Sequence, residues 1–112
     1  MKRMTRYDYD ENLDILHIYT SEIDNGIKGG LSYGNFNIDI GTDNKIVGIE
    51  LEGASSLLNM FPETLSSLDN VALIVRKTGN ILFIGFTVIK GEQKSTIQMN
   101  VPTKKAQVAV TN

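Results

Sequence analysis

Two segments of the chain alternate between apolar and polar residues with the period of two that is typical of half-buried β-strands. The clearer segment covers residues 36–51, with a turn expected at residues 41–45. Its polar positions, including Asp39 and Glu50, are expected to face water. Its apolar positions are expected to face a common interior: Phe36, Ile38, Ile40, Val47, Ile49 and Leu51. This pattern predicts an antiparallel hairpin.

The earlier segment, residues 7–19, predicts a second hairpin whose turn is rich in Asp and Asn. After that turn, Leu16 and Ile18 fall on one face, while His17 falls on the other face with Ile15 and Tyr19. Apolar residues on both faces indicate a central strand, or one that is covered on both sides.

The remaining segments are less regular. Four glycines in residues 21–34 predict a loop or a bulged edge strand. Ser55 or Ser56 is expected to cap a short helix, and Pro62 to stop it and begin another. Further strands are expected at residues 70–77, 81–90 and 95–101, with a flexible tail at residues 102–112.

Together these elements predict an α+β fold, with a mostly antiparallel sheet of about seven strands and one or two short helices after residue 53. The 112 residues suit one domain with one apolar core. Within it, residues 7–58 hold the two hairpins, and residues 59–101 hold the short helix and the C-terminal strands.

Composition excludes several chemistries. There is no cysteine, so disulfides, thiolate catalysis and cysteine-ligated zinc cannot occur in this sequence. The longest apolar run, residues 81–89, has the length of a strand and not the roughly 20 residues of a membrane-spanning helix. We therefore expect a cytoplasmic protein without a membrane segment.

The net charge of −2 hides an uneven distribution. Residues 1–69 hold five Lys/Arg and twelve Asp/Glu, whereas residues 70–112 hold six Lys/Arg and one Asp/Glu. The two halves could attract each other, or the basic half could form a face for nucleic acid or an acidic partner. The basic side chains of this half include Lys90, Lys94, Lys104 and Lys105. Few aromatic residues and no RNA-binding motif accompany them, which argues against binding of nucleic acid.

Two motifs resemble those of a known family. Residues 9–18, with Tyr9, Asp10 and Asp14, resemble the "YDxExDxLYI" opening of the domain of unknown function 2283 family. Residues 38–55 are similar to its "VDYDEDGRIVGIEILDAS" segment, although His17 stands where that family usually has tyrosine. The resemblance covers residues 7–58 and implies a small cytoplasmic α+β protein with no assigned activity. Some members sit beside toxin-like genes, which implies an antitoxin-like or partner-binding role.

Three residues are candidates for chemistry. His17 is the only histidine and therefore the only side chain that ordinarily titrates near neutral pH. Asp39 and Glu50, on the outward faces of neighbouring strands, could form an acid–base pair. A catalytic site also needs a nucleophile, an orienting partner and a cleft. The sequence shows none of these, so we assign no catalytic, cofactor-binding or metal-ligating residue from it.

Two other motifs resemble known sites in their residue letters but lack the structural context or spacing that those sites need. Residues 30–34 read G-x-S-x-G, but the nucleophile elbow needs a strand before the serine, a helix after it and a later histidine. The acidic residues around the first turn lack the spacing of a calcium loop. Within this cluster of Asp8, Asp10, Glu11 and Asp14, we expect Asp10, with Asn12, to shape the turn and Asp14 to face solvent.

The sequence thus favours a non-catalytic module for protein–protein interaction or regulation. The apolar strand at residues 81–89 would promote aggregation if it were exposed, so it is central or lies in an interface between copies. Gly85 in it would allow close approach of another backbone or ring. We expect a homodimer or another homo-oligomer, with a further protein partner as an option. The alternatives are a small enzyme using His17, Asp39 or Glu50, and a nucleic-acid accessory protein using the basic half.

Overall fold

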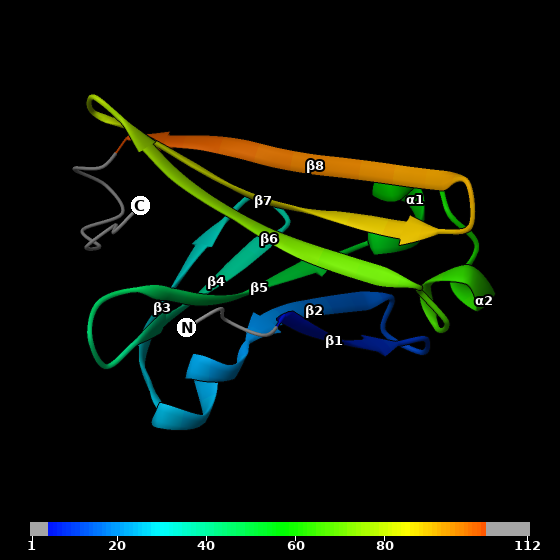
Figure 1. The fold of residues 1–112 in the computed structure, drawn as a ribbon, viewed down its shortest axis with the longest axis horizontal. Helices are drawn as coiled ribbons and strands as arrows, with labels where there is room; N and C mark the ends of the chain where they lie inside the picture. Colours follow the sequence, from blue (N-terminus) through cyan, green and yellow to red (C-terminus); the bar gives the residue numbers. More distant parts are fainter. Residues whose placement is uncertain (1–4, 103–112) are drawn as a thin grey trace.

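The computed structural model describes residues 5–102, which form two antiparallel sheets (Figure 1). A five-stranded sheet has the order β1-β2-β5-β4-β3, and a three-stranded sheet has the order β6-β7-β8. The strands are β1 (Thr5–Asp10), β2 (Ile15–Thr20), β3 (Ile27–Tyr33), β4 (Phe36–Gly41), β5 (Ile46–Glu52), β6 (Asn70–Thr78), β7 (Ile81–Lys90) and β8 (Gln93–Pro102).

The helices are short, so the described part of the chain is predominantly β. They are the 3₁₀ helix η1 (Ser21–Asn25), α1 (Ala54–Leu58) and α2 (Pro62–Leu65). The predicted mostly antiparallel sheet is confirmed. The helical share is smaller than the α+β label suggests, and eight strands in two sheets replace about seven strands in one.

The strands with apolar residues on both faces occupy central positions, as predicted. β2 lies between β1 and β5, and β7 lies between β6 and β8. Leu16 and Ile18 on β2 are fully buried, and so are Leu82, Ile84 and Phe86 on β7. A central strand has no unpaired edge, which removes the aggregation risk that its sequence carries.

One core joins the two sheets, because their inner faces pack against each other. Leu16 and Ile49 from the five-stranded sheet and Leu82 and Phe86 from the three-stranded sheet belong to the same buried cluster. The rings of Phe36 and Phe86 lie 6.3 Å apart across this interface. The result is a two-layer sandwich with α1 and α2 at one end (Figure 1).

Several details differ from the prediction. Residues 21–34 contain η1 and then the edge strand β3, so the bulged-edge interpretation was the correct one. The β4–β5 register shifts after Asp39, which places Ile40 opposite Ile46. Ile46 joins the core as a result, whereas Ile40 is only partly buried.

The chain ends differently from the prediction as well. Pro102 pairs with Ile81 as the last residue of β8 and does not begin the tail. The rest of the predicted tail, with Lys104 and Lys105, lies outside the described residues.

Candidate functional site

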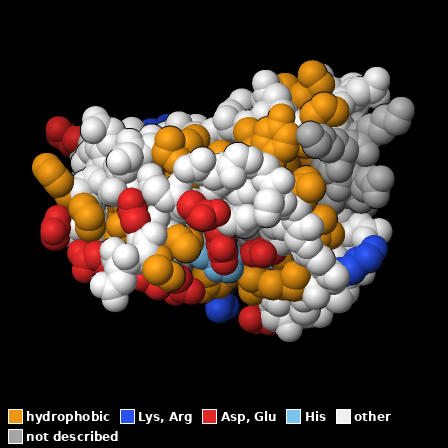
Figure 2. Space-filling model, turned by 180° about the vertical axis from the view of Figure 1, so that it is seen from behind, with side chains coloured by type: hydrophobic (Ala, Val, Ile, Leu, Met, Phe, Trp, Pro, Cys, Tyr) orange, Lys and Arg blue, Asp and Glu red, His pale blue; other side chains and the backbone are white. Residues whose placement is uncertain are grey.

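The outer face of the five-stranded sheet is acidic. Side chains alternate between the two faces along each strand, so the residues between the buried positions of β1, β2, β4 and β5 point away from the core. We call this surface the acidic face, and it carries five carboxylates beside one arginine and one histidine: Asp8, Asp10, Asp39, Glu50, Glu52, Arg6 and His17. Figure 2 shows the histidine next to several acidic side chains.

His17 and Asp39 meet across the central strand of this sheet. His17 lies on β2 and Asp39 on β4, with β5 running between them. The Nε2 atom of His17 lies 2.7 Å from the Oδ2 atom of Asp39, and the two side chains are 22% and 20% exposed. This partly buried ion pair therefore connects β2 to β4 across β5.

Gly48 makes that contact possible. It lies on β5 opposite both Tyr19 and Asp39. A Cβ atom at Gly48 would lie 2.6 Å from the Asp39 Oδ2 atom and 3.0 Å from the His17 Nε2 atom. Any side chain there would displace one or both partners, so the glycine leaves the space in which the ion pair forms.

The aromatic residue beside His17 extends the network to β1. The rings of His17 and Tyr19 lie 4.8 Å apart at an angle of 36°. The Tyr19 hydroxyl donates a hydrogen bond of 3.0 Å to Asp8. Burial, and then this bond to an anion, raise the pKa of Tyr19, so it stays a neutral donor.

The acidic surroundings favour the charged form of His17. Partial burial of the ring opposes ionisation, but the hydrogen bond and charge of Asp39, with the charges of Glu50 and Asp8, outweigh it. The pKa of His17 is therefore raised above its ordinary value of 6.5. Imidazolium is the form that this arrangement stabilises.

The ion pair should stabilise the fold in a pH-dependent way. Because the folded-state pKa is raised, the contribution is fully present below 6.5 and is lost as pH rises through the raised pKa. We expect the difference in unfolding free energy between wild type and His17→Gln to shrink across that range, measured by urea denaturation. As the only histidine, His17 also gives a single imidazole signal in an NMR titration. Its midpoint should lie above 6.5 and should fall in Asp39→Asn; a wild-type midpoint at or below 6.5 would contradict the assignment.

The three sequence candidates share one face but form no acid–base pair of carboxylates. Asp39 lies opposite Gly48 and contacts His17, whereas Glu50 lies opposite Asn37 on one side and His17 on the other. The orienting partner that the sequence did not reveal for His17 is Asp39. Within residues 5–102, no group of three or more His, Cys, Asp or Glu residues could hold a metal ion.

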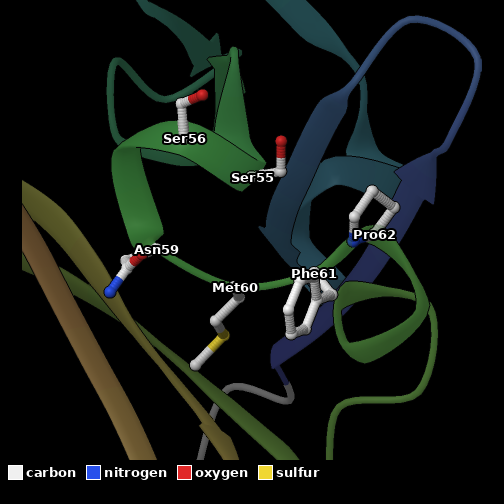
Figure 3. A pocket seen from close by; sticks show the side chains of 6 residues that line it. All are labelled: Ser55, Ser56, Asn59, Met60, Phe61 and Pro62. Carbon is white, nitrogen blue, oxygen red and sulfur yellow. The ribbon is translucent and has the colours of Figure 1, made fainter.

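A groove lies elsewhere, between α1 and the start of α2. It has a volume of about 520 Å³, and Figure 3 shows its lining: Ser55, Ser56, Asn59, Met60, Phe61 and Pro62. Phe61 is 77% exposed beside it. None of the three candidate residues lines this groove, so the hollow and the charged face are separate features.

The G-x-S-x-G segment does not form a nucleophile elbow. Ser32 lies within the edge strand β3, and its hydroxyl donates to the side chain of Asn37. Gly34, with φ of 59°, allows the turn from β3 into β4. The strand that follows Ser32 leaves it without the helix that an elbow requires.

Asp14 is a structural centre that sequence reasoning missed, because it was expected to face solvent. Its carboxylate accepts hydrogen bonds from the Tyr9 hydroxyl at 2.6 Å and from the Ser55 amide and hydroxyl at 3.0 and 2.7 Å. The predicted caps Ser55 and Ser56 are not the N-cap of α1: Gly53 holds that position, and Asp14 supplies the acceptor.

No helix within the described range has the length and apolar composition to cross a membrane. Comparisons of the chain with protein families, with curated proteins and with solved structures each found no match. The resemblance to the domain of unknown function 2283 family therefore stays a prediction from its two motifs.

Proposed function

We propose that this protein is a non-catalytic interaction module whose acidic face binds a basic surface of a partner. The observation that carries the proposal is the charge of that face: five carboxylates lie beside Arg6 and His17 on one side of the sandwich. The helices α1 and α2 lie at one end of the molecule, and the short helix η1 contacts β4 and β5 (Figure 1). An excess of negative charge on a face steers and selects a positively charged partner.

The state of His17 supports a structural role within a binding face. Its Nε2 atom is engaged by Asp39, and the charged imidazole is favoured. The groove between α1 and α2 is lined by none of the charged residues of the acidic face. A cationic His17 lies over Gly48 and connects β2 to β4 through Asp39. This connection holds the carboxylates of the acidic face in fixed positions.

The proposal is tested by binding of poly-L-lysine as a basic probe. We expect Glu50→Gln/Glu52→Gln to weaken binding about tenfold at low salt, because two charges leave the centre of the face. The matched control is Glu63→Gln/Glu92→Gln, which removes the same charge from exposed sites outside the face. Circular dichroism verifies the fold of each variant. Equal weakening in both pairs would show that net charge alone acts, and would overturn the proposal.

A further inference from the structure

The outer face of the three-stranded sheet has the opposite character. Its central strand β7 presents Phe83, Thr87 and Ile89 there, each partly exposed, and Ile81, which is 44% exposed. Flanking strands add further residues to what we call the basic-apolar face: Ala72, Ile74, Arg76, Lys94, Thr96 and Gln98. The guanidinium of Arg76 lies 4.9 Å from the ring centre of Phe83.

This face carries positive charge without a compensating carboxylate. Along the outward positions of β6, β7 and β8 in the described chain, Arg76 and Lys94 are the charged residues, and no Asp or Glu occurs. The helix α1 contacts β8 from the inner side, where the Ser95 hydroxyl donates to the carbonyl of Leu58. Within residues 5–102, no helix or further strand covers the outer side, which has an apolar centre (Figure 1).

The two faces are complementary, but one molecule cannot bring them together. They lie on opposite sides of the sandwich, since the inner faces of both sheets form the common core. We propose that the acidic face of one copy binds the basic-apolar face of a second copy, so that copies associate head to tail. This inference rests on the proposed function of the acidic face and names its partner. Such a heterologous contact repeats without closing, and gives an open series of oligomers.

The small area of the proposed contact indicates a weak association between copies. Three strands of about ten residues cover roughly 14 Å by 33 Å, or about 450 Å², at ordinary strand spacing and rise. Stable complexes bury about 800 Å² on each partner. The association should therefore be reversible and dependent on concentration, and salt should weaken it because charges contribute much of the attraction.

Charge reversal on each face provides the test, read by sedimentation velocity at about 0.01 M and about 1 M salt. We expect the wild type to show a weight-average mass above the monomer that rises with concentration at low salt and falls at high salt. Glu50→Lys/Glu52→Lys removes the net negative charge of the acidic face, because three aspartates then stand against Arg6 and two lysines, and Arg76→Glu/Lys94→Glu makes the other face acidic. Each double variant alone should be monomeric. The fourfold variant, in which positions 50 and 52 are basic and positions 76 and 94 are acidic, should associate again.

The outcomes separate this inference from the proposed function. A wild type that stays monomeric at all salts, while poly-L-lysine binding still depends on Glu50 and Glu52, would overturn the self-association and leave the acidic face as a binding site. Association that persists in Glu50→Lys/Glu52→Lys would also overturn it, because the contact would then not depend on the negative charge of the acidic face. If a reversal variant fails to fold, neutral Glu50→Gln/Glu52→Gln replaces it and should lower the association at least severalfold.

Discussion

Replacing Gly85 by alanine should destabilise the protein by about 3 kcal/mol, the upper end for overpacking a tight site. A Cβ atom at Gly85 would lie 2.1 Å from the carbonyl oxygen of Ile97 and 2.5 Å from the Cα atom of Gln98. Both are backbone atoms of β8, so no rotamer change relieves the clash. The ladder between β7 and β8 must open instead. Urea denaturation, followed by circular dichroism, measures the loss.

Gly29→Ala is the matched control for this prediction. Gly29 lies on the edge strand β3, and a Cβ atom there would meet nothing within 4 Å. Its replacement should change the unfolding free energy by less than about 0.5 kcal/mol, as exposed substitutions usually do. Equal effects at Gly85 and Gly29 would contradict the close approach of β8 to β7.

Replacing Asp14 by alanine should cost a similar amount, about 3 kcal/mol, since hydrogen bonds to a charged acceptor contribute about 1.5 to 3 kcal/mol each and are not additive. The change leaves the Tyr9 hydroxyl and two donors of Ser55 without their acceptor. Asp14 also has φ of 54°, a conformation that Asp and Asn tolerate better than alanine. Asp14→Asn keeps that tolerance and one acceptor oxygen, so it should lose less.

The charge-dependent part of the contribution of Asp14 should disappear in acid. Burial opposes its ionisation, but the hydrogen bonds from Tyr9 and Ser55 outweigh burial and hold the pKa of Asp14 below its ordinary 3.8. Because the folded-state pKa is lowered, the stabilisation is present above 3.8 and is lost as pH falls through the lowered pKa. The difference between wild type and Asp14→Ala should therefore narrow only in that acidic range. A difference that is constant with pH would show that the charge of Asp14 does not act.

Local periodicity was enough to predict most of the strands. The alternation in residues 36–51 placed Phe36 and Ile38 in the core correctly, because a strand buries every second residue when one face is covered. It misplaced Ile40, because a register shift within the hairpin exchanges the buried position for Ile46. Such a shift depends on pairing between strands and leaves no mark in the local pattern.

The candidate site was predicted as a set of residues but not as a geometry. His17, Asp39 and Glu50 do share one face, yet the ion pair of His17 with Asp39 spans 22 residues of sequence and a whole intervening strand. The one local signal was Gly48, a glycine at an outward position of an otherwise regular strand. Asp14 was missed for a related reason, since its partner Ser55 lies 41 residues away.

The most direct test of the acidic face as a binding surface is an NMR titration of the ¹⁵N-labelled protein with poly-L-lysine at low salt. Binding at this surface predicts chemical-shift changes at His17, Asp39 and Glu50 and their neighbours on β2, β4 and β5. The amide signals of the groove residues Ser55, Ser56, Asn59, Met60 and Phe61 should stay unchanged. Shifts that gather around Phe61 and leave His17 unmoved would contradict the account.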